Sequence, residues 1–110
     1  MELRKIEGRR IAAAKNSPEL DALIARCLAA ATKGNSGAYY DLGVAYSTGS
    51  HGAPCDLIEA HKWFNLAAAG GHEEAAWCRA DVSDEMAARE IAEAQRRARQ
   101  WLADGSRKAA

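Results

Sequence analysis

The chain has 110 residues, of which 48% are apolar and only 6% aromatic. This length suits one domain with a single core, and the balance of 15 basic and 15 acidic residues argues against a nucleic-acid partner, which favours a basic excess. No apolar run approaches the roughly 18 residues of a membrane span, and the first residues lack the apolar stretch of a signal peptide. We therefore expect a cytoplasmic protein that contacts neither a membrane nor nucleic acid.

The first predicted helix begins after residue 17. Residues 1–16 are rich in charge, and we expect this segment to be only partly helical or mobile. Ser17 can accept a hydrogen bond from a free backbone N–H, and Pro18 suits the first helical position. Apolar residues then recur at helical spacing from Leu20 to Ala31, and Gly34 should end the helix as a left-handed cap.

The next two helices are predicted over residues 36–47 and 57–69. A glycine-rich loop separates them, Asp56 is a candidate cap for the second of the two, and Gly70-Gly71 should end it. The helix over 36–47 should bury Ala38, Leu42, Ala45 and Tyr46. The helix over 57–69 should bury Ala60, Trp63, Phe64, Ala67 and Ala68.

A short helix over 73–81 and a long last helix complete the chain. Ser83 is the expected cap of the last helix, Asp104-Gly105 its end, and residues 105–110 a frayed tail. Its apolar stripe is predicted from Ala87, Ile91, Ala94, Ala98, Trp101 and Leu102. The sequence thus predicts an all-α domain over residues 17–104, built of antiparallel helix pairs with short links.

One phrase occurs twice, thirty-seven residues apart in the sequence. Ala30-Ala31, Gly34 and Ala38 in the first copy correspond to Ala67-Ala68, Gly71 and Ala75 in the second. A fixed period of this size is typical of a solenoid, in which each unit buries its apolar face against its neighbours.

The repeated positions give a resemblance to a known family. Residues 38–75 resemble a Sel-1-like repeat, with an insertion in the loop after Gly49. The matching positions are Ala38, Leu42, Gly43, Tyr46, Gly49, Ala60, Trp63, Ala67, Ala68, Gly71 and Ala75, and Gly34 belongs to the preceding unit. The resemblance implies a tetratricopeptide-like α/α superhelix of about two repeats with capping helices. It further implies a scaffold or adaptor that binds another protein and has no catalytic residues or cofactor.

A candidate partner-binding surface follows from the same alignment. Tyr40 and Trp77 occupy equivalent positions one repeat apart, and two aromatic rings in a shallow groove would anchor a partner segment. Val44, Ser47 and Asp81 lie on the same predicted side. In an alternative interpretation, both rings simply cover the seam between repeats.

Other functions remain as alternatives. The open end of a short solenoid could pair with a second copy and form a homodimer. A metal or thiol enzyme is a further alternative, but no second pair of ligands with zinc-finger spacing accompanies His51 and Cys55, so we expect no metal. The odd set of three cysteines (Cys27, Cys55 and Cys78) favours free thiols over a disulfide framework. Alternating charges on the last helix indicate a solvated face more than an RNA-binding stripe of Arg96, Arg97, Arg99 and Arg107.

Overall fold

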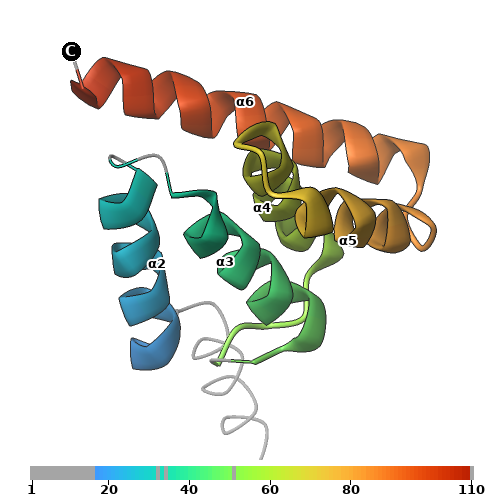
Figure 1. Cartoon of the computed structure of the whole chain (residues 1–110). Helices are drawn as coiled ribbons and strands as arrows, with labels where there is room; N and C mark the ends of the chain where they lie inside the picture. The colour runs from blue at the N-terminus through green and yellow to red at the C-terminus, as the bar shows by residue number, and fades with distance from the viewer. Residues whose placement is uncertain (1–16, 32, 34, 51, 110) are drawn as a thin grey trace, which may run out of the picture.

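The computed structural model describes residues 17–109 except residues 32, 34 and 51, and within them it is all-helical. It contains no strand in these ranges, which confirms that this part of the chain is all-α, whereas the predicted superhelix stays a prediction. The helices are α2 (Pro18–Ala31), α3 (Ser36–Thr48), α4 (Leu57–Ala69), α5 (Glu73–Ser83) and α6 (Ala88–Ala109) (Figure 1). Two predictions, a partly helical or mobile segment at residues 1–16 and a left-handed cap at Gly34, concern residues outside the described ranges.

Two predicted helix starts are confirmed by their hydrogen bonds. The Ser17 hydroxyl accepts from the backbone N–H of Leu20 at 3.0 Å. The Asp56 carboxylate accepts from the N–H groups of Ile58 and Glu59 at 3.0 and 3.2 Å. Each side chain therefore satisfies donors that have no partner inside the helix.

The predicted start and end of the last helix are wrong. Ser83 is the final residue of α5, where its hydroxyl donates to the carbonyl of Arg79 at 2.8 Å instead of capping α6. The helix begins at Ala88, and the Glu90 carboxylate accepts from the Ala87 N–H at 2.8 Å. At its other end α6 continues through Gly105 to Ala109, so Asp104-Gly105 does not end it.

The core lies where α3 crosses α4. Leu42, Ala45 and Tyr46 from α3 are buried against a second set from α4, namely Ala60, Trp63, Phe64, Leu66 and Ala67. Gly43 sits at the crossing, where a side-chain Cβ would lie 2.5 Å from Cε1 of Phe64. Gly43 therefore permits a close approach of α3 to α4.

Two glycines of the repeat motif adopt backbone angles that other residues avoid. Gly49 follows α3 with φ 78°, and its N–H donates to the Ala45 carbonyl at 2.8 Å. Gly71 has a φ of 100°, just after α4 ends at Ala69, so the predicted end of this helix at Gly70-Gly71 is confirmed.

Helix α4 is the centre of the packing. It contacts α3 on one side and both α5 and α6 on others, while α2 packs against α3. Figure 1 shows α6 crossing over α4, with α2 and α3 side by side. Because the buried stripe of α6 faces α4, the close antiparallel pairing that we expected between the last two helices is not found. On that stripe Ala94 and Ala98 are buried, whereas Ala87 and Leu102 are exposed and were wrongly assigned to it.

Candidate functional site

The exposed side of α5 is a stripe of carboxylates around one tryptophan. At 3.6 residues per turn, one arc of this helix and its C-terminal cap contains only exposed residues, which are Glu73, Glu74, Trp77, Ala80, Asp81 and Asp84. We call this set the α5 face. Trp77 lies at its middle and is 73% exposed, which is unusual for so large an apolar side chain.

The charges of the α5 face are all of one sign. Within the described ranges, none of its four carboxylates forms an ion pair. The one basic residue of α5, Arg79, lies on another side of the helix, where its guanidinium donates to the Asn65 side-chain oxygen at 2.7 Å. The indole ring of Trp77 is therefore bordered by negative charge.

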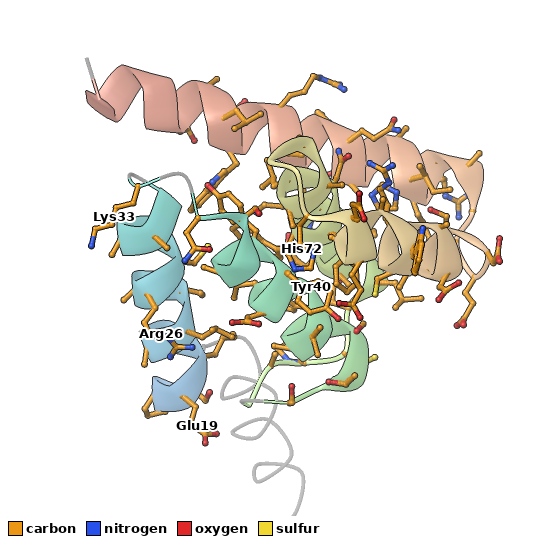
Figure 2. All side chains as sticks on the ribbon, viewed as in Figure 1. Glu19, Arg26, Lys33, Tyr40 and His72 are labelled. Atoms are coloured by element: carbon orange, nitrogen blue, oxygen red, sulfur yellow. The ribbon has the colours of Figure 1, made fainter. Side chains whose placement is uncertain are left out.

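Tyr40 lies in a different environment from Trp77. Its ring stacks on His72, with centroids 4.4 Å apart and planes at 14°, and lies 5.8 Å from the ring of Phe64. Figure 2 shows Tyr40 and His72 pointing toward each other where α3 meets the start of α5. Burial, together with nearby Cys78 and Glu74, raises the pKa of the Tyr40 hydroxyl. Tyr40 thus covers the seam between helices, as the alternative interpretation predicted for it, and Trp77 does not.

The other three predicted binding residues are divided between these two environments. Val44 is half-buried on α3, and its carbonyl accepts from the hydroxyl groups of Ser47 at 3.1 Å and Thr48 at 2.8 Å. Ser47 therefore uses its hydroxyl within its own helix. Asp81 is exposed and belongs to the α5 face one turn after Trp77. Of the five predicted residues, the structure places Trp77 and Asp81 together on an accessible surface.

A second cluster, which sequence reasoning missed, joins α3, α4 and α6. Trp63 meets Trp101 edge-on with centroids 4.9 Å apart and stacks on Tyr39 at 5.8 Å. The indole N–H of Trp101 donates to the Tyr39 hydroxyl at 3.1 Å. The ammonium of Lys62 lies 4.2 Å from the centroid of Trp63, a cation–π contact. These contacts fix α6 on α4.

Ion pairs continue this cluster toward the surface. Arg97 bonds both Glu59 and Glu93 at 2.7 Å, and Arg96 bonds Glu93 at 2.8 Å. The two guanidinium groups lower the pKa of Glu93 to about 2, with the hydrogen bonds of Arg96 as the largest cause.

A shallow cavity of about 170 Å³ lies beside these ion pairs, lined by Lys62, Arg96, Arg97, Gln100, Trp101 and Asp104. Because the charges around it are largely paired with each other, this cavity is a weaker candidate for binding than the α5 face. Glu59 and Arg97 are 38 positions apart in the sequence, so their ion pair could not be predicted from a local pattern.

The thiols and histidines were the candidates for a metal or thiol site. Cys27, Cys55 and Cys78 are free, and burial raises the pKa of Cys27 to about 12, which keeps that thiol protonated. His61 is buried, and burial together with Arg79 lowers its pKa. Among the residues that the structure describes, no group of three potential ligands could hold a metal ion. His51 lies outside the described residues, so its pairing with Cys55 stays untested.

Comparisons with protein-family models, with curated proteins and with solved structures find no match to this chain. The resemblance to Sel-1-like repeats therefore remains a prediction. Within the described part of the chain, no helix combines the length and the apolar character that crossing a membrane requires.

Proposed function

We propose that this protein is a non-catalytic protein-binding module of the Sel-1-like type, which captures its partner on the α5 face. The exposure of Trp77 carries this proposal. Covering a tryptophan side chain contributes roughly 2–3 kcal/mol of hydrophobic free energy, and tryptophan is among the residues that most often dominate protein interfaces. The carboxylates around the ring add specificity through charge, since they favour a partner of opposite sign.

The packing of α3 on α4 and of α4 on α6 supports the repeat assignment within this proposal, whereas α5 and α6 do not form the close pair that the later unit should contain. The motif residues Gly43, Trp63 and Ala67 all lie where α3 and α4 meet. In a Sel-1-like arrangement α4 and α6 are the second helices of successive units, and these two helices are packed together. Helix α5 is then the first helix of the later unit, and in superhelices of this type first helices present the binding surface.

Affinity capture with matched variants tests the proposal. The immobilised protein, Trp77→Ala and Leu102→Ala are compared as baits against the lysate of the source cells, and the retained chains are identified by mass spectrometry. Leu102 is the matched control, because it is the other large apolar residue exposed in the described part of the chain. We expect Leu102→Ala to retain the same partner as the parent and Trp77→Ala to lose it. Loss of a central tryptophan weakens binding by about 2 kcal/mol or more, roughly thirtyfold in Kd.

The helical circular dichroism of both variants should match that of the parent, since exposed positions outside the core change stability by only about 0.5 kcal/mol. If Trp77→Ala retains the partner as well as Leu102→Ala does, the α5 face is not the binding surface. If neither the parent nor the variants retain a specific chain, the protein-binding proposal itself is wrong.

A further inference from the structure

The outer side of α6 carries the opposite charge pattern to the α5 face. Over residues 89–103, one exposed arc of α6 contains three arginines and no carboxylate, and its members are Arg89, Ala92, Arg96, Arg99 and Ala103. We call this set the α6 face. Arg89 and Arg99 form no ion pair with any described residue, and Arg96 is 58% exposed while its guanidinium is held by Glu93. The molecule therefore exposes one acidic and one basic helix surface.

The spacing of the two faces matches position by position. Glu74, Trp77, Asp81 and Asp84 follow each other at intervals of three, four and three residues. Arg89, Ala92, Arg96 and Arg99 follow at the same intervals. Asp84 has α-helical backbone angles, so it continues the α5 stripe beyond Ser83. Two helices laid side by side in parallel would bring each acidic residue opposite an arginine, with the small Ala92 opposite the ring of Trp77.

We propose that the protein associates with a second copy of itself head to tail, the α6 face of one molecule docking on the α5 face of the next. Three charge pairs form in this contact, namely Glu74–Arg89, Asp81–Arg96 and Asp84–Arg99. The Trp77 ring is covered by the stem atoms of the neighbouring arginines and by Ala92, which gives the contact its apolar centre. The proposal uses the same α5 face as the protein-binding function above and names one occupant for it.

Both faces are exposed within a single molecule, so they cannot satisfy each other in the monomer. Each face is of one sign, so neither can pair with its own copy across a two-fold axis. In the head-to-tail contact that we propose the two surfaces differ, so an α5 face and an α6 face stay open at the ends after each addition. The formal net charge of zero means that copies do not repel each other as whole molecules.

Sedimentation velocity on the full chain tests the association. The weight-average mass should equal 11.8 kDa when dilute and rise steadily with concentration. Loading from about 10 µM to about 1 mM covers the micromolar-to-millimolar Kd range of a contact with few charge pairs. Raising salt to about 1 M, where the Debye length is only about 3 Å, should return the mass to that of one chain. A mass that stays at one chain over this whole range, or an association that salt leaves unchanged, overturns the proposal.

Two double variants test whether the α5 face and the α6 face form the contact between copies. Glu74→Ala/Asp81→Ala disables the acidic face, Arg89→Ala/Arg99→Ala disables the basic face, and all four positions are exposed, so both variants should keep the parent's helicity. Each variant alone should remain monomeric. Mixed in equal amounts, they should form a 1:1 dimer and nothing larger, because each supplies the one face that the other lacks. Self-association of either variant alone, or a mixture that stays monomeric, overturns the head-to-tail contact.

These outcomes are separable from those of the protein-binding proposal. A strictly monomeric parent that still retains a partner through Trp77 would refute the self-association and leave the binding function intact. Association without any other retained chain would support the self-association and refute a separate partner.

Discussion

Replacing Gly43 with alanine tests how closely α3 approaches α4. A Cβ at this position would lie 2.5 Å from Cε1 of Phe64 and 2.9 Å from its Cγ, whereas carbon atoms in good contact are about 3.5–4.0 Å apart. Either the helices separate by about 1 Å or the Phe64 ring leaves its preferred rotamer, and such overpacking costs about 1–3 kcal/mol. Alanine also favours a helix over glycine by about 1 kcal/mol, which offsets part of that cost.

Because the new Cβ would lie far inside normal contact distance, the overpacking cost should lie near the upper end of the range given above. After the gain in helix propensity is subtracted, we expect the free energy of unfolding to fall by about 2 kcal/mol. For a domain of this size the corresponding fall in Tm is about 8–16 °C. Thermal unfolding by circular dichroism and urea titration both measure it. Gly105→Ala is the matched control, because Gly105 is also helical and has no atom within 4 Å of its would-be Cβ. It should be neutral or stabilise by up to about 1 kcal/mol.

A double-mutant cycle then assigns the loss to the ring. Phe64→Leu removes the aromatic atoms that the new methyl group would meet, so Gly43→Ala should cost about 1 kcal/mol or more less in that background than in the parent. If Gly43→Ala is as stable as Gly105→Ala, or if the two substitutions at the crossing are additive, the close approach of α3 and α4 is wrong.

Two further predictions concern buried titratable groups. The pKa of His61 is lowered by burial and by Arg79, so its contribution to stability is present above the unfolded value of about 6.5 and is lost as pH falls below it. Urea unfolding should therefore show decreasing stability from about pH 7.5 to about pH 5.5, and His61→Leu should flatten that slope; an unchanged slope contradicts the burial of His61. Cys27, with a pKa of about 12, should react with a thiol reagent only after unfolding, whereas exposed Cys55 reacts in the native protein; a fast Cys27 in a Cys55→Ser variant contradicts this.

The local features of this fold could be predicted from the sequence. Ser17 and Asp56 cap the helices that they precede, because a cap depends on a side chain and N–H groups two or three residues away. Ser83 was misassigned because a serine hydroxyl can serve a helix at either end, and here it bonds the carbonyl four residues before it. The local sequence is compatible with Ser83 at the end of one helix and at the start of the next, so it does not decide between these two roles.

The partner of α6 could not be predicted in this way. Antiparallel pairing with α5 follows from the short link alone, but the side chains that decide the packing are Trp101 and Arg97, which meet Tyr39, Trp63 and Glu59 from distant parts of the chain. For the candidate site, the repeat alignment placed Tyr40 and Trp77 at equivalent positions, but the structure exposes Trp77 and stacks Tyr40 on His72. The partial burial of Tyr40 depends on His72, whose ring position the repeat alignment does not specify.

The α5 face is wide because α5 buries few of its residues against the other helices. Ala75 is its single buried residue, whereas six residues of α4 are buried. Helix α5 is otherwise attached through half-buried Cys78 and Val82, the Arg79–Asn65 hydrogen bond and the stacking of His72 on Tyr40. A helix with so small a buried side has a wide exposed one, which leaves room for Trp77 and four carboxylates. Because few apolar contacts hold α5, its local opening costs less free energy than that of α4. Any molecule that covers the α5 face therefore adds to the stability of the helix that presents it.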